Sequence, residues 1–372
     1  DNPAFEFALP VLLLPAGGGE PVRTELAFNG REAEARVPLT AAPAAIVADP
    51  DLTVLADVRV QQDTAAWATQ ARLGPTLASR VRAVRALGGL SDRAAVSTLA
   101  AIARDAAAHP ALRAEATSAL GRVGEGALLV ELTRMNNLPQ EWRVREAAFN
   151  ALAAAVRAAR EGSSAAPSAA ASAPTGARPV DTAELQNGVD IAAAILSRPS
   201  REPSQKVRAA AVRFLGAARA TRQLPLVLAA ARTDAQDDRL RIAAIDALRE
   251  FDRPESLRAV IELTRAGVLS RTRPGALAAA AALAKHDPEA AFAGIRAVLD
   301  DPATERRAYV AAGQAMVDLG DARGVEELER VLLSRRDADD RAQVRQWLEA
   351  LRTKLEVRPA AEGAAGSAGA GG

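Results

Sequence analysis

The sequence contains only two histidines, and each is followed by residues that usually end a helix. His109 precedes Pro110, and His286 precedes Asp287 and Pro288. A catalytic zinc centre of the H-E-x-x-H type needs two imidazoles one helical turn apart, with a glutamate as the base. These two histidines are 177 residues apart in the sequence. We therefore predict that they end helices and that the chain has no metal ligands.

Other catalytic patterns are also missing. The chain has no cysteine, no G-x-S-x-G motif and no P-loop, and the glycines at 121–126 have the wrong order for a dinucleotide fingerprint. Those glycines are better explained as a helix terminus. The pairs Glu326–Glu327 and Asp300–Asp301 have the residue types of an acid–base pair, but on a helical repeat they are typical of a solvated face or a cap. We predict no catalytic and no cofactor-binding residue in this chain.

A basic cluster at Arg80, Arg82 and Arg85 suggests nucleic-acid binding, but the composition opposes it. The chain has 47 basic and 46 acidic residues, and only 3% of its residues are aromatic. Such a balance produces no overall positive field to attract phosphates. The large aromatic residues are predicted to pack in the core or between repeats; they are Trp67, Trp142, Trp347 and Tyr309. We predict no nucleic-acid partner.

The strongest pattern is an arginine followed at three and six positions by a small residue, as at Arg113 and Arg241. The best-formed copies begin at Arg113, Arg145 and Arg241, and looser copies begin at Arg80, Arg208, Arg273, Arg306 and Arg341. In chain order these eight arginines are separated by 33, 32, 63, 33, 32, 33 and 35 residues. A constant period of this size indicates stacked supersecondary units, none of which can bury its apolar face alone. The predicted fold is mainly α, an α–α solenoid.

Each unit is predicted to be two antiparallel helices. Arg241, Ala244, Leu248 and Phe251 lie on one helical stripe, and a second amphipathic segment follows at 255–264. Acidic pairs precede three of the arginines, namely Asp237–Asp238, Asp300–Asp301 and Asp339–Asp340. We predict that each of the eight anchor arginines is structural. Each would pair with the acidic loop before it and determine how one helix pair sits on the next.

The signature residues distinguish between repeat families. The T-P-L-H-x-A motif of ankyrin repeats and the Trp, Gly, Tyr and Pro pattern of tetratricopeptide repeats are both absent. Instead, a hydrophobic residue precedes the arginine and alanines follow it, as at Val144–Arg145, Val207–Arg208 and Leu240–Arg241. Residues 78–356 therefore resemble short bacterial HEAT-like repeats, an armadillo-like architecture. This resemblance implies a HEAT-like superhelix.

The repeat does not extend over the whole chain. The predicted organisation is a small β domain at 1–62, a first block of repeats at 63–160, a disordered linker at 161–180, a second block at 181–357 and a disordered tail at 358–372. The linker is rich in Ser, Ala and Pro and has too little apolar bulk to fold. An insertion within one inter-helix loop fits the interval of 63 residues better than a lost repeat.

The first sixty residues alternate with the period of two that β-strands show. The predicted strands are 5–14, 22–28, 33–39 and 45–48. Asn29–Gly30, between the second and the third, is the favoured two-residue hairpin turn. We predict a small antiparallel sheet of about four strands, part of a β-sandwich, packed on the first helices or on strands that precede Asp1.

An ordered set of motifs continues from these strands into the first helices. The motifs are Phe5-x-Phe7-x-Leu9-Pro10, Pro43-x-x-Ile46-Val47-x-Asp49-Pro50, Trp67-x-x-Gln70 and Arg80-x-x-Ala83-x-x-Ala86-Leu87. Their order resembles the junction between the β-sandwich and the helical domain of aminopeptidase-N-like gluzincins, a family of zinc metallopeptidases. In that family a β-rich domain and a zinc domain come first, and a HEAT-like domain then closes over the active site.

The resemblance implies that this chain is a noncatalytic C-terminal region that encloses substrate. It also implies that zinc belongs to a catalytic domain upstream of Asp1, because none of the zinc-binding or catalytic residues of the family maps onto this sequence. Two alternatives remain. A standalone HEAT-like scaffold would bind a protein partner along its concave face. A HEAT-like DNA-binding protein would need a basic stripe with aromatic wedges, which the composition opposes.

The expected partner is a protein or a peptide. The longest clean apolar run, 276–284, is shorter than the ~20 residues that span a bilayer, so no membrane span is predicted. The absence of cysteine excludes disulfides but leaves both cytoplasmic and periplasmic or secreted compartments open.

Overall fold

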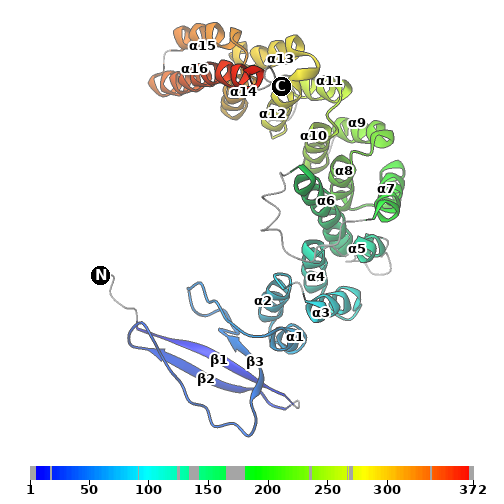
Figure 1. Ribbon diagram of the computed structural model, residues 1–372, viewed down its shortest axis with the longest axis vertical. Helices are drawn as coiled ribbons and strands as arrows, with labels where there is room; N and C mark the ends of the chain where they lie inside the picture. The colour runs from blue at the N-terminus through cyan, green and yellow to red at the C-terminus, as the bar shows by residue number, and fades with distance from the viewer. Residues whose placement is uncertain are drawn as a thin grey trace. The chain divides into compact units, whose positions relative to one another are not determined.

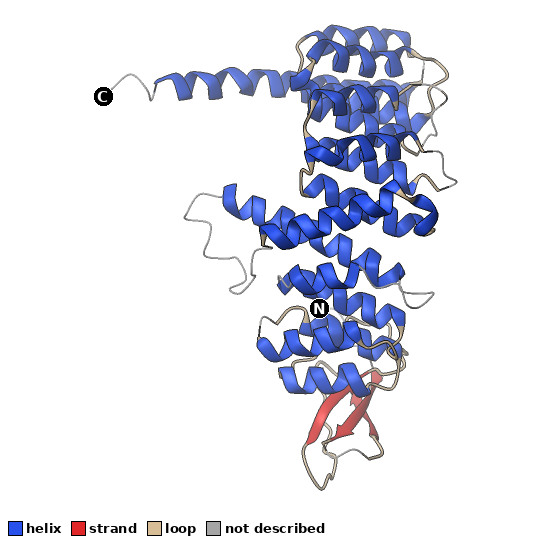
Figure 2. Cartoon of the chain, turned by 90° about the vertical axis from the view of Figure 1, so that its right-hand side faces the viewer, coloured by secondary structure: helices blue, strands red, loops and turns tan. Residues whose placement is uncertain are grey.

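The computed structural model describes residues 6–16, 19–90, 92–123, 126–133, 142–164, 181–233, 237–265, 267, 271–335 and 337–367. This part of the chain is mostly helical and contains one small antiparallel sheet, as the sequence predicts (Figure 2). The chain divides into two compact units, Asp1–Ile191 and Ala192–Gly372. The fold class is therefore confirmed, with paired helices making up most of each unit.

Unit 1 contains the sheet and three helix pairs. Its helices are α1 (Thr64–Leu73), α2 (Leu77–Leu87), α3 (Arg93–Arg104), α4 (Pro110–Val123), α5 (Gly126–Thr133) and α6 (Trp142–Ser164). The two helices of each pair pack on each other, and the second helices α2, α4 and α6 stack in order (Figure 1). Helices α1 and α3 are neighbours in the other layer. Each pair therefore covers the apolar face of the next.

Unit 2 is also built from paired helices. Its helices are α8 (Gln205–Ala217), α9 (Leu224–Arg232), α10 (Arg239–Phe251), α11 (Pro254–Glu262), α12 (Arg273–Leu283), α13 (Pro288–Asp300), α14 (Arg306–Leu319), α15 (Arg323–Ser334) and α16 (Ala338–Ser367). The short 3₁₀ helices are η2 (Pro199–Arg201), η3 (Thr221–Gln223) and η4 (Ala284–His286), and α7 (Thr182–Ser197) crosses the boundary between the units. Even-numbered helices α8 to α16 form one layer and odd-numbered helices α9 to α15 form the other (Figure 1).

Short polar side chains begin many of these helices. Asp63, Asp92 and Asp287 each accept a hydrogen bond from the backbone amide three residues ahead, at 2.7, 2.8 and 3.0 Å. Thr76 and Ser79 form a reciprocal capping box at the start of α2. These bonds satisfy amides that have no partner within the helix. The helix boundaries thus follow directly from local sequence.

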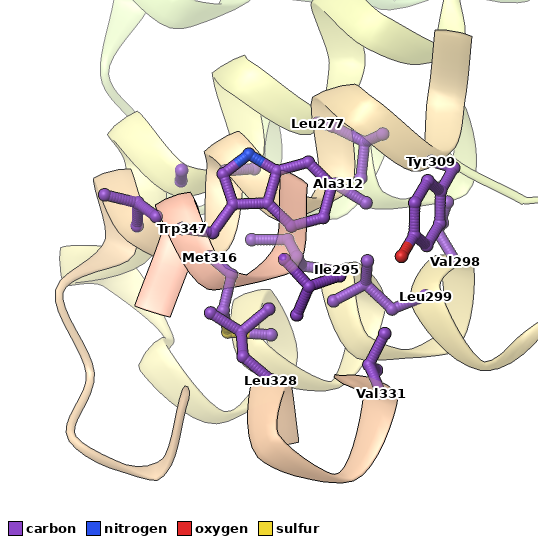
Figure 3. Close-up of a cluster of buried hydrophobic side chains, with 14 of the residues drawn as sticks. Leu277, Ile295, Val298, Leu299, Tyr309, Ala312, Met316, Leu328, Val331 and Trp347 are labelled. Atoms are coloured by element: carbon purple, nitrogen blue, oxygen red, sulfur yellow. The ribbon is translucent and has the colours of Figure 1, made fainter. Parts of the chain in front are cut away.

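The core of unit 2 is built around a few large residues among many small ones. Trp347 of α16 packs among Leu277, Ile295, Met316 and Leu328 (Figure 3). The rings of Tyr309 and Trp347 meet edge to face, with centroids 5.5 Å apart. Trp347, Tyr309 and Trp67 are all buried, in agreement with the predicted packing role of the aromatic residues. Trp142 is half-buried, with the Arg143 guanidinium 4.9 Å from its ring centroid.

The sheet has the strand order β2-β1-β3, with both pairs antiparallel. Its strands are β1 (Phe7–Pro15), β2 (Val22–Phe28) and β3 (Pro43–Ala48). Leu12, Leu14, Ala45 and Val47 form a buried cluster on one face of the sheet, against Ala66 of α1. The sheet is therefore attached to the first helix pair by apolar contacts.

The predicted hairpin at Asn29–Gly30 is wrong. Residues 33–39 form no strand, and neither residue of the turn has the positive φ that a type I′ turn needs. A two-residue turn there would put Glu25 opposite Glu34 and Arg23 opposite Arg36. Like charges directly across two strands destabilise their pairing. Strand β2 pairs with β1 through its other edge, which places Leu26 opposite Leu9 and Phe28 opposite Phe7.

Two predicted disordered segments overlap helices. The predicted linker begins at residue 161, whereas α6 continues to Ser164, and 165–180 lie outside the described residues. The predicted tail begins at residue 358, whereas the backbone of α16 remains helical to Ser367. Alanine has the highest helix propensity, and residues 360, 361, 364 and 365 are all alanine. This composition favours continuation of the helix.

Candidate functional site

A polar junction, made of residues 46–54 and of side chains from Gln62 to Arg82, joins the sheet to the first helix pair. At its centre Asp49 is 2% exposed. Its carboxylate accepts hydrogen bonds from Thr53 N at 2.8 Å, Thr53 Oγ1 at 3.1 Å and Val54 N at 3.2 Å. Burial alone would raise the pKa of Asp49, but these hydrogen bonds hold it below its usual value. The carboxylate therefore holds the turn that leaves β3.

Two glutamines connect this turn to the helices. Gln62 accepts a hydrogen bond from Ile46 N at 3.1 Å and donates to Gln70 Oε1 at 2.9 Å. Gln70 is 1% exposed and donates to Ser79 O at 2.9 Å. The chain of bonds thus runs from β3 through α1 into α2.

Helix α2 also contacts the backbone of the turn directly. Thr76 Oγ1 donates to Pro50 O at 2.9 Å, and the Arg82 guanidinium donates to Ala48 O at 2.6 Å. Motif residues Ile46, Asp49–Pro50 and Gln70, which are far apart in the sequence, therefore belong to one hydrogen-bonded junction.

Four anchor arginines share one contact that sequence reasoning did not predict. The Nε atoms of Arg80, Arg113, Arg241 and Arg273 donate to the carbonyls of Ala71, Ala103, Ala231 and Thr264, at 2.9, 3.1, 3.1 and 3.0 Å. Each acceptor lies at or just beyond the C-terminal end of the preceding helix. A cation is favourable there because the last carbonyls of a helix lack partners and carry partial negative charge. Each of these arginines thus connects the two helices of its own pair.

The predicted pairing of anchors with preceding acidic loops holds only in part. Arg241 also contacts Asp238 at 3.3 Å, which agrees with the prediction. Arg273 instead contacts Glu305 at 2.6 Å, which begins the second helix of the following pair. Arg145 and Arg208 are half-buried near the starts of α6 and α8.

The last two anchors are not equivalent to the others. Arg306 and Arg341 are exposed, and Arg306 pairs with Asp340. The end of α13 receives Arg335 instead, which donates to Leu299 O at 3.5 Å and covers the Tyr309 ring at 4.4 Å. Sequence reasoning missed Arg335 because it lies in the loop before α16. Ala338 follows it at three positions, but Arg341, and not a small residue, follows it at six, so Arg335 fits only half of the repeat pattern.

Ion pairs between consecutive repeats neutralise many of the remaining basic residues. Their partners are 27 to 34 residues apart, about one period. The pairs are Arg85–Glu115, Arg104–Glu131, Arg232–Glu262, Lys285–Asp252 and Arg323–Glu289. The near-zero net charge of the chain thus reflects charges that face one another between repeats.

The basic cluster at Arg80, Arg82 and Arg85 contains no free guanidinium. Arg80 and Arg82 donate to backbone carbonyls, and Arg85 pairs with Glu115 at 3.2 Å. A phosphate would have to compete with each of these contacts. The geometry therefore gives no support to nucleic-acid binding at this cluster.

The prediction that both histidines end helices holds for His286, the last residue of η4, but not for His109, which precedes the first residue of α4. His109 Nδ1 accepts a hydrogen bond from Ala111 N at 3.2 Å, where α4 begins. His286 Nε2 lies 2.8 Å from Asp252 Oδ1 at the end of η4. Within the residues that the structure describes, no group of three or more His, Asp or Glu side chains is arranged to hold a metal ion.

One residue of each acidic pair, Asp300 and Glu327, belongs to an ion-pair network between two helices. Residues of helices α13 and α15 line an open pocket of about 590 Å³. Glu327, 6% exposed, contacts Arg296 at 3.1 Å and pairs with Arg330, and both arginines also pair with Asp300. Burial raises the pKa of Glu327. Because every carboxylate of this network contacts an arginine, it fastens α13 to α15 and does not resemble an acid–base pair.

No helix in the described part of the chain is long and apolar enough to cross a membrane.

Comparison with known proteins identifies the repeats. Residues 65–153 and 192–277 match the family model of HEAT repeats. No curated protein matches the sequence. Three similar solved structures are human deoxyhypusine hydroxylase in complex with glycerol, Escherichia coli YibA, and Legionella pneumophila aminopeptidase A in complex with aspartic acid.

Their sequence identities to this chain are 18%, 13% and 10%, and the TM-scores are 0.31, 0.47 and 0.49. The matches cover 79%, 80% and 92% of this chain, and 96%, 99% and 45% of the respective structures. The match to the family model, together with the paired and stacked helices, shows that residues 65–153 and 192–277 contain HEAT repeats.

Proposed function

We propose that this chain is the noncatalytic, C-terminal region of a zinc aminopeptidase-like protein, where its HEAT repeats support the catalytic domain and enclose the substrate. The observation that carries this proposal is the polar junction. Ile46, Asp49–Pro50 and Gln70 belong to the motifs that resemble aminopeptidase-N-like gluzincins, and they meet in one set of hydrogen bonds. That these motif residues lie together in the structure is an observation independent of their order in the sequence.

A second feature of the sheet supports the proposal. The face opposite to α1, here called the apolar sheet face, is formed by Phe7, Leu9, Val11, Leu13, Val22, Leu26, Phe28 and Ile46. Phe7, Val22 and Ile46 are 38%, 38% and 41% exposed, and the rings of Phe7 and Phe28 stack at 4.6 Å. A sheet that is apolar on both faces needs a second packing layer. A β-sandwich, which the resemblance implies, would provide that layer.

In this proposal the chain contributes a structural framework and no catalytic residues. The junction fixes the sheet to the first HEAT repeat, so a domain that packs on the sheet would have a defined position relative to that repeat. Zinc and the catalytic residues would belong to the other domain. The walls of the substrate chamber would come from the repeats, and the substrate class would be peptides.

The coding sequence upstream of Asp1 tests the proposal. An H-E-x-x-H motif followed about one helix later by a ligand glutamate would support it. A start codon immediately before Asp1 or an unrelated upstream domain would refute it. A peptidase assay of this chain with added zinc complements that test, since robust activity would contradict a noncatalytic role.

A standalone HEAT scaffold is the second candidate, and the surface of α12 favours it. Gly275, Ala278 and Ala282 form an exposed stripe of short side chains on this helix. A partner could approach the helix backbone closely there. If the upstream coding sequence lacks a zinc motif, binding of a protein partner along the layer of even-numbered helices becomes the leading explanation.

A further inference from the structure

We propose that strand β2 pairs with β2 of a second copy of this chain, so that two three-stranded sheets form one six-stranded sheet. The observations that carry the proposal are the free outer edge of β2 and the order of its side chains. Strand β2 has one neighbour, β1, within the described residues. Its other edge therefore presents backbone donors and acceptors that a further strand can use.

The two edges of the sheet differ. On β3 the amide of Ile46 is already bound to the Gln62 side chain, Pro43 begins the strand, and the register with β1 shifts at Leu14/Pro15. Each of these features discourages another strand from adding to that edge. Strand β2 contains no proline and pairs with β1 without a register shift. Of the two edges, that of β2 is the one suited to pairing.

The side chains of β2 are complementary to themselves. The central residues read Val22-Arg23-Thr24-Glu25-Leu26. An antiparallel pairing with a two-fold axis at Thr24 puts Arg23 of each copy opposite Glu25 of the other. The same register puts Val22 opposite Leu26 and Thr24 opposite Thr24. Opposite charges and threonine pairs directly across two strands are both favourable.

The same rule explains why the chain does not cover this edge itself. A hairpin through Asn29–Gly30 would place Glu25 opposite Glu34 and Arg23 opposite Arg36, which are pairs of like charge. In the dimer, Glu25 and Arg23 would each face a residue of opposite charge. Arg23 already contacts Asp51 at 2.9 Å through Nη1, so in the dimer Glu25 of the second copy would share this exposed guanidinium with Asp51. Glu25 is exposed and faces no cation in the described structure.

Pairing would also extend the apolar sheet face. Val22, Thr24 and Leu26 point to that face, so the second copy would continue it across the two-fold axis. The edge and the face are separate surfaces, and a domain packed on the apolar sheet face would leave the β2 edge accessible. The dimer would therefore form whichever function the HEAT repeats serve.

Sedimentation velocity of the full chain over a wide concentration range tests the proposal. We expect a reversible monomer–dimer equilibrium. Glu25→Arg places an arginine opposite Arg23 of the other copy at two symmetric positions. This repulsion should raise the dissociation constant of the dimer about tenfold or more. The double charge exchange Arg23→Glu with Glu25→Arg restores both ion pairs and should recover the dimer. Glu32→Arg, an equal change of charge at an exposed position outside the sheet, should leave the dissociation constant unchanged.

Cysteine cross-linking provides an independent readout, because the chain has no native cysteine. Thr24→Cys places two thiols opposite each other at the two-fold axis and should give a disulfide-linked dimer under mild oxidation. Glu32→Cys should not. A monomeric wild type at all concentrations, a Glu25→Arg dimer as tight as wild type, a failed charge exchange, or equal cross-linking at both cysteines would overturn the proposal. Thermal melting by circular dichroism confirms that each variant is folded.

Discussion

Gly216 of α8 lies so close to Ala247 of α10 that a methyl group on Gly216 would come within 2.5 Å of Ala247 Cα. The same relationship recurs between Gly88 and Ala119, and between Gly121 and Ala151. In each case the glycine lies eight residues after its anchor arginine, and the alanine lies six residues after the next anchor. The second helices of neighbouring HEAT repeats therefore approach each other through a repeated glycine–alanine contact.

Gly216→Ala is expected to destabilise unit 2 because backbone atoms of α10 cannot move aside as a flexible side chain would. A reduction of about 1–3 kcal/mol in the free energy of unfolding is expected. Gly275→Ala is the matched control: the added methyl group would meet only Ile245 Cγ2 at 3.8 Å. That change should be neutral or stabilising by up to ~1 kcal/mol, since alanine favours a helix. Urea denaturation measures both, and equal stabilities for the two variants would contradict the close-contact explanation.

Arg241→Ala is expected to lower stability before it alters any binding. The buried guanidinium contacts Ala231 O, Thr233 O and Asp238, which would all lose a donor. Leaving such groups unpaired costs about 1–3 kcal/mol. Arg306→Ala removes an exposed anchor whose ion pair with Asp340 is at the surface, and should cost less than about 1 kcal/mol. An Arg241→Ala variant with wild-type thermal stability would show that this anchor is not structural.

Arg335→Ala should be more destabilising than Arg341→Ala, although Arg341 is the residue that belongs to the sequence repeat. Arg335 covers the Tyr309 ring and binds Leu299 O, whereas Arg341 is exposed. Loss of the contact with the ring alone corresponds to about 0.5–2 kcal/mol. The melting temperatures of the two variants test this prediction. A lower melting temperature for Arg341→Ala than for Arg335→Ala would show that Arg335 does not take the place of the anchor arginine.

Asp49→Asn should destabilise the polar junction in a pH-dependent manner. The pKa of Asp49 is lowered in the folded chain, so its carboxylate contributes stability above the unfolded pKa of about 4, and this contribution is lost as the pH falls through the folded pKa. The difference in melting temperature between wild type and Asp49→Asn should therefore be largest near neutral pH and should shrink in acid. Asp57→Asn removes an exposed carboxylate that pairs with Arg59, and it should have little effect at any pH. A constant difference for Asp49→Asn from neutral to acid pH would refute this role.

The periodic residues predicted the helix pairs because helical geometry is local. Positions 0, +3, +7 and +10 from each well-formed anchor arginine share one helical stripe that is apolar after the arginine, and such a stripe needs a neighbour of the same kind. The HEAT architecture followed from this spacing. The candidate junction was also visible in part, since Asp49–Pro50 and Gln70 stood out as motif residues before their contacts were known.

The hairpin at Asn29–Gly30 shows where local rules fail. The turn residues and the alternation of residues 33–39 are those of a β-hairpin. However, the charges that would face each other across its two strands are alike, which disfavours their pairing. Through its other edge β2 pairs with β1, which brings Leu9 and Phe7 opposite Leu26 and Phe28. Which strands pair therefore depends on the side chains that face one another across strands, and not on the turn residues alone.

The sequence by itself determined the repeat, the helix pairs and the positions of the anchor arginines, because these depend on spacing along one helix. Only the tertiary structure decided what the anchors bind. Arg113 and Arg241 donate to carbonyls ten residues before them, a relationship that exists only after two helices have folded against each other. The tertiary structure also decided that Arg335 replaces Arg306 at the end of α13, because the last contact at a helix terminus goes to whichever guanidinium the packing brings within reach.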